Sequence, residues 1–135
     1  MASVFEKLNL KQQREIVVVN APATFGAELR KLKGVVVHTR IPAGKPVAFA
    51  LVFATRKAEV DALAGSLAKA APGDAIVWFA YPKGTSKRYA CDFNRDTGWD
   101  ALRRHGFETV RQVAIDEDWS ALRFRRAEFV KSSSR

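Results

Sequence analysis

The sequence has few of the residues that build cross-links or membrane spans. Its 135 residues include one cysteine, Cys91, so an internal disulfide is excluded and a reducing, cytoplasmic location is expected. The longest apolar run, 47–54, is much shorter than the roughly 20 residues that cross a bilayer. The N-terminus is polar and shows no signal peptide. We therefore expect no membrane partner.

Glycine is missing where the common cofactor sites need it. Dinucleotide and S-adenosylmethionine sites use closely spaced glycines after the first strand, so that the backbone can approach the ligand. This chain has Asn20-Ala21-Pro22-Ala23-Thr24 at that place, and Gly26 follows too late. The second predicted strand ends in His38-Thr39-Arg40, without the acidic residue that would hold a ribose hydroxyl. The sequence therefore predicts no standard cofactor.

Recognisable catalytic and metal-binding sets are missing as well. Neither histidine has a second metal ligand at helical or turn spacing, and Cys91 has no histidine nearby in the sequence. Three carboxylates cluster at 116–118, but adjacent residues of a turn diverge. A solvated hairpin turn is therefore favoured there over acid–base or metal chemistry. We predict no catalytic residue and no metal site.

What the sequence does have is positive charge. The formal net charge is +9, from 23 basic and 14 acidic residues. Residues 1–74 hold eleven basic and six acidic residues, and residues 75–135 hold twelve and eight, so the excess is spread along the chain. A positive excess favours anionic partners, such as nucleic acid, phosphorylated small molecules or an acidic protein.

Apolar strands alternate with helical patterns along most of the chain. Strands are predicted at 15–20, 34–39, 47–54 and 75–81, and the first and third of them have the apolar pattern of buried strands. Helices are predicted at 24–32, 55–71 and 97–105; Thr24 and Thr55 are the expected N-caps, and Thr97 with Asp100 forms a capping box. The strands at 110–115 and 121–126 are separated by too few residues for a parallel crossover, so they form an antiparallel hairpin.

These elements predict an α/β fold, a three-layer Rossmann-like sandwich with a mostly parallel sheet and a C-terminal antiparallel hairpin. We assign 1–130 to a single domain and 131–135 to a polar tail. The order of elements resembles the Rossmann-like sheet of the class I methyltransferases, which also ends in an antiparallel hairpin. By this resemblance, the sheet is one crossover shorter than theirs.

Ligands of open α/β sheets bind outside the carboxyl ends of the strands. The loops expected there are 20–24, 54–57, 81–94 and 116–120. The segment 83–88 combines glycine, hydroxyls and three cations, a set that suits a phosphate or a carboxylate, although it does not have the spacing of a nucleotide-binding P-loop. The predicted ligand-binding residues are Asn20, Thr24, Lys83, Thr85, Ser86, Lys87, Arg88 and Trp119.

Three phrases support a family resemblance: Asn20-Ala21-Pro22, Trp78-x-x-Tyr81-Pro82-Lys83, and Asp116-x-x-Trp119-Ser120-x-Leu122-Arg123-Phe124. Together they resemble a family of small bacterial proteins known only as a domain of unknown function. The similarity extends from about Leu8 to Arg126. It implies a bacterial, stand-alone domain, and it brings no activity, cofactor or catalytic residue.

The sequence favours a non-enzymatic binding module for a small anionic ligand or an acidic protein. Two alternatives stay open. One is a methyltransferase-like enzyme with an altered cofactor pocket. The other is a single-stranded nucleic-acid binding protein, because aromatic residues interleave with cations near the predicted loop edge (Trp78, Tyr81, Tyr89, Phe93, Trp99 and Trp119).

Overall fold

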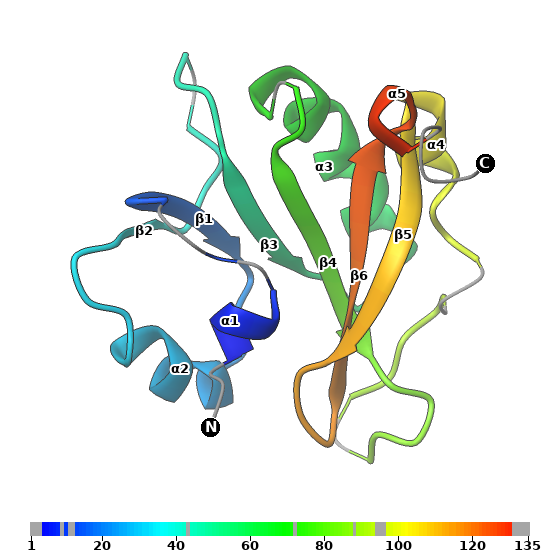
Figure 1. Cartoon of the computed structure of the whole chain (residues 1–135). Helices are drawn as coiled ribbons and strands as arrows, with labels where there is room; N and C mark the ends of the chain where they lie inside the picture. Colours follow the sequence, from blue (N-terminus) through cyan, green and yellow to red (C-terminus); the bar gives the residue numbers. More distant parts are fainter. Residues whose placement is uncertain are drawn as a thin grey trace.

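The computed structural model describes residues 4–8, 10, 13–42, 44–71, 73–87, 89–93 and 97–130. Its six strands form one sheet in the order β2-β1-β3-β4-β6-β5 (Figure 1). The β2–β1, β1–β3 and β3–β4 pairs are parallel, and the β4–β6 and β6–β5 pairs are antiparallel. The strands are β1 (Glu15–Val19), β2 (Val36–His38), β3 (Phe49–Phe53), β4 (Ile76–Pro82), β5 (Phe107–Ala114) and β6 (Trp119–Arg126). The predicted fold class is confirmed.

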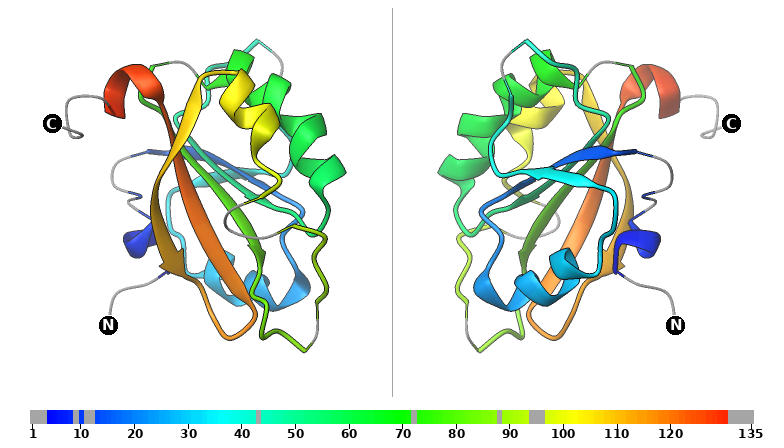
Figure 2. Two further views of the ribbon diagram at one scale, coloured as in Figure 1. Left: turned by 90° about the vertical axis from the view of Figure 1, so that its right-hand side faces the viewer. Right: turned by 90° about the vertical axis from the view of Figure 1, so that its left-hand side faces the viewer.

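Helices cover both faces of this sheet, which makes three layers (Figure 2). One face carries the longest helix together with α4, and the other face carries the short N-terminal helices. None of the helices in the described part of the chain is long and apolar enough to span a membrane. The helices are α1 (Val4–Lys7), η1 (Ala23–Phe25), α2 (Gly26–Arg30), α3 (Lys57–Ala70), α4 (Asp100–Arg104) and α5 (Ala127–Val130).

The central strand β3 is buried along its whole length, as expected for a parallel strand between two helical layers. Its side chains alternate between the two layers, so Ala50 and Val52 pack with the apolar side of α3. Phe49, Leu51 and Phe53 pack with the core on the α1 side of the sheet. Burying one such large side chain stabilises the fold by about 1.5–3 kcal/mol. These two clusters fix the sheet in place beneath its loops.

The predicted helix caps are wrong. Thr24 lies inside η1, whose preceding residue is Pro22, and no side chain of the described residues caps that turn. Helix α4 begins at Asp100 after Trp99, so Thr97 and Asp100 do not form a capping box. Burial explains both starts, because Phe25 and Trp99 are core residues whose packing sets where each turn begins.

The start of α3 also differs from the prediction. The helix begins at Lys57 rather than Thr55, and a side chain of its first turn binds the two backbone amides that precede it. The Oε1 atom of Glu59 accepts hydrogen bonds from the backbone N–H groups of Thr55, at 2.8 Å, and Arg56, at 3.1 Å. The Thr55 hydroxyl donates to the same oxygen at 3.4 Å, so it does not act as the N-cap acceptor that we predicted.

The predicted hairpin is present, but both of its strands are longer than expected. An irregularity between Thr109 and Arg111 leaves Val110 out of register and 38% exposed. A bulge of this kind interrupts the apolar alternation by which a strand is identified in a sequence. It also changes which face each later residue takes, so that Gln112 shares a face with Leu122 and Arg111 shares the opposite face with Arg123.

The order of the strands reverses between β1 and β3. Strand β2 lies on one side of β1, whereas the chain returns on its other side to begin β3. In open α/β sheets this reversal opens a crevice for ligands at the carboxyl ends of the strands. At this edge lie the turn after Val19, the start of α3, the loop after β4 and the turn before β6.

Candidate ligand site at the carboxyl end of β4

A pocket of about 710 Å³ lies at the carboxyl end of β4. The strand supplies its floor, the loop after the strand supplies one wall, and the hairpin supplies the other. Its lining combines aromatic rings with hydroxyl, amide and thiol groups, and Lys83 is the one charged residue among the lining residues that the structure describes. They are Tyr81, Pro82, Lys83, Gly84, Ser86, Tyr89, Ala90, Cys91, Phe93, Gln112 and Ser120.

Tyr81 forms the floor of the pocket. Its ring packs against Phe93 and Trp99, with centroid separations of 6.1 Å and 5.8 Å. Its hydroxyl accepts a hydrogen bond of 2.9 Å from Nε2 of Gln112 on β5. Ser120, directly opposite Tyr81 in the β4–β6 register, is the one buried polar residue of the described chain. The floor thus presents two hydroxyls and an amide beside packed rings.

The loop after β4 is fastened to the acidic turn of the hairpin. The backbone N–H of Lys83 donates to the Asp118 carbonyl oxygen at 2.7 Å. The Ser86 hydroxyl donates to Oδ1 of Asp118 at 2.8 Å, and Oγ of Ser86 accepts from the N–H of Tyr89 at 3.2 Å. The two segments that the sequence placed at one sheet edge are therefore in direct contact.

These contacts are made by a backbone amide and a hydroxyl, and they do not involve the lysine ammonium groups of the loop. Lys83 is half-buried, and within the described ranges its ammonium makes no hydrogen bond or ion pair. Thr85 and Lys87 are exposed and do not line the pocket. Arg88 lies outside the described residues. Lys83 is thus the cation of the loop that the structure places at the pocket.

Trp119 lies beside the pocket rather than on its lining. It is 3% exposed and packs between Phe53 and Tyr89, at centroid separations of 5.0 Å and 4.9 Å. Its Nε1 atom is buried and has no hydrogen-bond partner among the described residues. Tyr89 in turn lines the pocket, so Trp119 supports the position of that ring.

The tryptophans do not form a stacking platform for bases. Trp78 and Trp99 are fully buried, and Trp119 is nearly so. Tyr81 and Phe93 are also buried, which leaves Tyr89 as the one half-buried ring of the set that suggested single-strand binding. Stacking of nucleic-acid bases needs exposed ring faces, and the burial of these side chains removes that argument for single-strand binding.

Cys91 lines the pocket but is not an activated nucleophile. Burial raises the pKa of its thiol, and the nearby carboxylates of Asp92 and Glu59 raise it further. The thiol is therefore protonated near neutral pH, whereas nucleophilic cysteines have a lowered pKa. No group of three or more histidine, cysteine or acidic residues among the described residues is placed to hold a metal ion.

At the reversal point, the turn after β1 is made without glycine. Asn20 takes a left-handed conformation with φ of 60°, which asparagine tolerates better than most residues. Asn20 and Thr24 are exposed at this turn, and neither lines the pocket after β4. The turn therefore needs no glycine, because Asn20 adopts the required left-handed conformation.

The residues at this turn do not fit an S-adenosylmethionine or dinucleotide site of the usual kind. Such a site needs backbone amides that a ligand can approach closely, but Ala21 and Ala23 carry side chains and Pro22 has no N–H. At the start of α3 the Lys57 N–H already donates to Oδ1 of Asp92 at 2.7 Å. The chain's own carboxylates thus take the amides that an anionic ligand would use.

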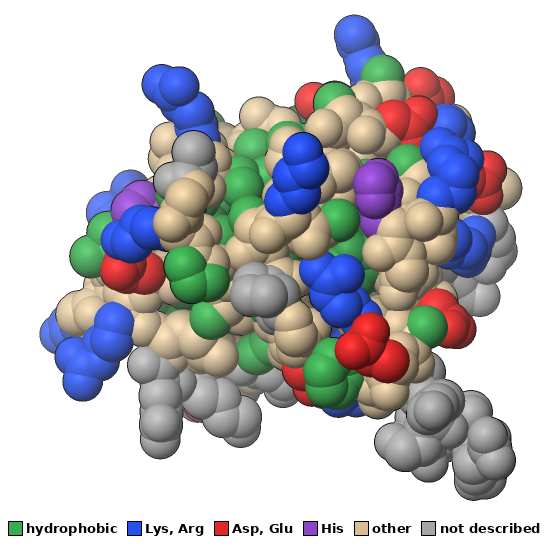
Figure 3. Space-filling view, turned by 90° about the horizontal axis from the view of Figure 1, so that it is seen from above, with side chains coloured by type: hydrophobic (Ala, Val, Ile, Leu, Met, Phe, Trp, Pro, Cys, Tyr) green, Lys and Arg blue, Asp and Glu red, His purple; other side chains and the backbone are tan. Residues whose placement is uncertain are grey.

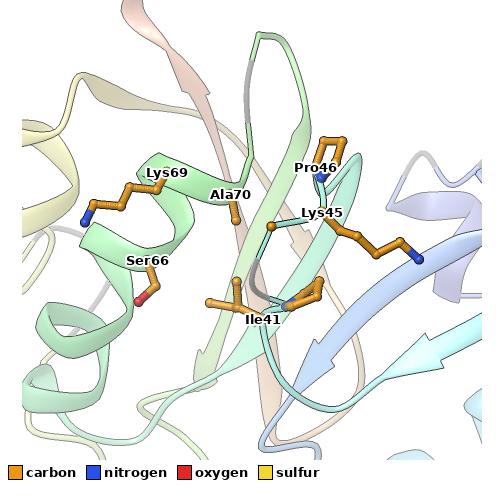
Figure 4. A pocket seen from close by; sticks show the side chains of 8 residues that line it. Ile41, Lys45, Pro46, Ser66, Lys69 and Ala70 are labelled. Atoms are coloured by element: carbon orange, nitrogen blue, oxygen red, sulfur yellow. The ribbon is translucent and has the colours of Figure 1, made fainter.

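A second pocket, of about 520 Å³, lies at the opposite edge of the sheet, between the loop before β3 and helix α3 (Figure 4). In Figure 4, Lys45 and Lys69 extend away from each other and away from the space between Ile41 and Ala70. The ammonium of Lys45 is bound to Glu15 at 2.9 Å. This pocket is at the amino ends of β1 and β3, away from the edge where ligands of such folds bind.

Several lining residues of the pocket after β4 were not predicted from the sequence. Gln112 reaches it because of the bulge in β5, which the alternation of side chains does not reveal. Tyr89, Cys91 and Phe93 reach it because Asp92 fastens their segment to α3, through the Lys57 N–H and the bond from the Asp92 N–H to the Thr55 carbonyl oxygen. The available signal was the length of the irregular segment after β4, which exceeds an ordinary connection.

No protein-family model and no curated protein sequence matches this chain, so the resemblance to a domain of unknown function stays an expectation. Solved structures do match. A SAM-dependent methyltransferase from Aquifex aeolicus is 14% identical, with a TM-score of 0.65, and the match covers 92% of this chain and 88% of that one. The glycopeptide N-methyltransferase MtfA is 8% identical, with a TM-score of 0.58, and the match covers 90% and 92%.

The pyocyanin biosynthetic protein PhzM is 16% identical, with a TM-score of 0.58, and the match covers 93% of this chain but 54% of PhzM. The TM-scores of these matches indicate a common fold. The sequence identities are too low to assign any catalytic residue to this chain. Together with the strand order and the C-terminal hairpin, the matches show that this chain has the Rossmann-like α/β fold of the SAM-dependent methyltransferases.

Proposed function

We propose that this protein is a methyltransferase-like domain with an altered ligand pocket, and that the pocket after β4 binds a small organic anion. The observation that carries the proposal is the placement of Lys83. It is the one charged residue among the described lining of the pocket, and its ammonium has no partner among the described residues. A half-buried cation in a lining of hydroxyls attracts a carboxylate or a phosphate.

The rest of the lining indicates what the anionic group is attached to. The half-buried ring of Tyr89 offers apolar surface, and the hydroxyls of Ser86 and Ser120 and the amide of Gln112 offer hydrogen bonds. Ligand pockets of this size use apolar walls for affinity and a few polar groups for orientation. The ligand class that fits is an aromatic or other apolar body that carries one acidic group.

Calorimetric titration tests this proposal with benzoate, phenyl phosphate and adenosine monophosphate, and with benzamide as the neutral analogue of benzoate. We expect binding of at least one anion and a weaker response to benzamide. Lys83→Ala should weaken the affinity by about tenfold, the loss of one charge-assisted contact. Lys87→Ala is the matched control, because Lys87 is exposed and does not line the pocket. Equal effects of the two substitutions, or no binding of any anion, would overturn the proposal.

The solved structures favour a second candidate more than they favour a passive binder. They include a SAM-dependent methyltransferase and two N-methyltransferases, so a methyltransferase-like enzyme with an altered cofactor pocket is the second function proposed. It requires an adenosyl ligand at the Asn20 turn in spite of the missing glycines. Titration with S-adenosylmethionine and S-adenosylhomocysteine separates the two candidates, because heat of binding at millimolar concentration supports the enzyme and its absence removes it.

A further inference from the structure

The β5–β6 hairpin presents a different set of residues on each face. One face, with Gln112 and Leu122, is turned toward Tyr81 and the core under α3. The other face carries Arg123, whose cross-strand neighbours are Trp78 on β4 and Arg111 on β5. Trp78 belongs to the core on the α1 side, so both arginines lie on that face, near the outer edge of the sheet (Figure 1).

Arg111 and Arg123 are direct cross-strand neighbours of like charge. Directly opposite residues of an antiparallel pair have their Cβ atoms about 4.5–5.5 Å apart, and like charges at such positions are destabilising. The charge of Asp74 offsets this repulsion only in part. Asp74 is engaged by Arg125, whose Nε and Nη2 atoms donate to its two oxygens at 2.8 Å and 2.6 Å.

Arg123 is half-buried, and its guanidinium donates no hydrogen bond within the described part of the chain. The Nε atom is buried and has no hydrogen-bond partner, and no ion pair of either Arg111 or Arg123 occurs among the described residues. Burial lowers the pKa of Arg123, and the charges of Arg125 and Arg111 lower it further against the opposing effect of Asp74. A guanidinium stays protonated in proteins, so this arrangement costs free energy unless an anion completes it.

We propose that Arg111 and Arg123 form a phosphate-binding pair on the outer face of the β5–β6 hairpin. The strand register places Arg111 and Arg123 directly opposite each other, and the planar N–H donors of a guanidinium match the oxygens of a phosphate group in a way that an ammonium cannot. The net charge of +9 favours an anionic ligand, and Figure 3 shows that basic side chains are spread over the face seen from above. This site is on the other face of the sheet from the Lys83 pocket and is independent of it.

NMR spectroscopy of the arginine Nε–H groups tests the pair in the whole chain. Sodium phosphate is titrated into labelled protein, with sodium chloride at matched ionic strength as the reference. We expect saturable shifts of the Arg111 and Arg123 signals with phosphate and only small, linear shifts with chloride. Equal responses to the two salts would overturn the proposal, and this wild-type measurement needs no variant to fold.

Two substitutions sharpen the test. Arg123→Lys keeps the charge but removes the planar donors, and it should raise the dissociation constant for phosphate about tenfold. Arg104→Ala removes an exposed arginine of α4 and should leave the constant unchanged. Lys83→Ala should also leave it unchanged, which separates this site from the pocket after β4. A constant that Arg123→Lys does not change contradicts the pairing.

A second arm identifies the source of the phosphate. A short single-stranded oligonucleotide is compared with phenyl phosphate on the same signals. Tighter binding of the oligonucleotide that falls steeply with salt assigns the pair to a nucleic-acid backbone, and comparable binding assigns it to a phosphorylated small molecule. Both results support the arginine pair, and a failure of both ligands to shift either arginine signal overturns it.

Discussion

Single residues beside the candidate site are held in two different ways. Trp78 and Trp119 both pack on the α1 side of the sheet, and both are buried. The indole N–H of Trp78 donates to the Leu8 carbonyl oxygen at 2.8 Å, whereas the indole N–H of Trp119 has no acceptor among the described residues. The first tryptophan is fixed by packing and a hydrogen bond, and the second by packing alone.

This difference predicts unequal costs for the same substitution. Trp78→Phe removes a buried hydrogen bond and leaves the Leu8 carbonyl without its donor, which typically costs about 1–3 kcal/mol beyond the lost volume. Trp119→Phe loses similar volume but removes an unsatisfied donor. We expect Trp119→Phe to be the milder change by about 1 kcal/mol in the free energy of unfolding, measured by urea denaturation. A larger cost at Trp119 would mean that its N–H is satisfied in solution.

Gly98 supports Phe93, a ring of the pocket. Its φ is +91°, and a Cβ atom at this position would lie 2.6 Å from the Cβ of Phe93. Gly98→Ala should therefore lower the free energy of unfolding by at least about 2 kcal/mol, from backbone strain of about 1 kcal/mol and a forced shift of Phe93. Gly84→Ala is the control, because nothing lies within 4 Å of a Cβ there. Denaturant unfolding of both variants decides, and equal stabilities would contradict this account.

At the scale of elements, the hairpin turn depends on one carboxylate. Oδ1 of Asp116 accepts hydrogen bonds from the backbone N–H groups of Asp118 and Trp119, at 2.8 Å and 2.9 Å. Asp116→Ala should cost about 1 kcal/mol of stability, and Asp116→Asn should cost less because it keeps the acceptor. Glu117→Ala is the control, because Glu117 is exposed in the same turn. Thermal unfolding measures all three, and an equal loss for Glu117→Ala would refute the role of Asp116.

The turn before β4 is joined to β6 by an ion pair that responds to pH. The hydrogen bonds from Arg125 hold the pKa of Asp74 below its usual value. A lowered pKa contributes stability above the ordinary aspartate pKa of about 3.9, and that contribution is lost as the pH falls through the folded-state value. Both partners are partly exposed, so the contribution is below about 1 kcal/mol.

Asp74→Asn should therefore lower the free energy of unfolding at pH 6, and the difference from wild type should shrink as the pH falls below about 4. Denaturant unfolding at several pH values gives this difference directly. A difference that stays constant across the acid range would show that the ion pair does not supply it.

The elements differ in how well the sequence predicted them. Strands β1, β3, β4 and β6 were predicted because their apolar residues are buried in the sheet. Strand β2, at the edge of the sheet, has three residues and leaves Val36 exposed, so it is shorter than its apolar run predicted. The starts of η1 and α4 were not predicted, because the burial of Phe25 and Trp99 overrides the hydroxyl caps nearby. Short helices α1 and α5, of four residues each, have too few turns to show a period.

In the molecule as a whole, a sheet like that of solved SAM-dependent methyltransferases is combined with a turn after β1 that is made without glycine. The edge of the sheet could be predicted, because parallel strands end together. Which loop at that edge forms a pocket could not. That depends on contacts distant in sequence, from Gln112 to Tyr81 and from Asp92 to Lys57.

Backbone amide NMR of the labelled chain decides between the pocket after β4 and the turn after β1 as the ligand site, in titrations with phenyl phosphate and, separately, with S-adenosylhomocysteine. We expect phenyl phosphate to shift the amide signals of Ser86, Gln112 and Ser120 more than the signals of Arg111 and Arg123. We expect S-adenosylhomocysteine to leave the amide signals of Asn20 and Thr24 unchanged. The proposal of a ligand pocket after β4 is contradicted if S-adenosylhomocysteine causes saturable shifts at Asn20 and Thr24 while phenyl phosphate shifts no amide signal around Lys83.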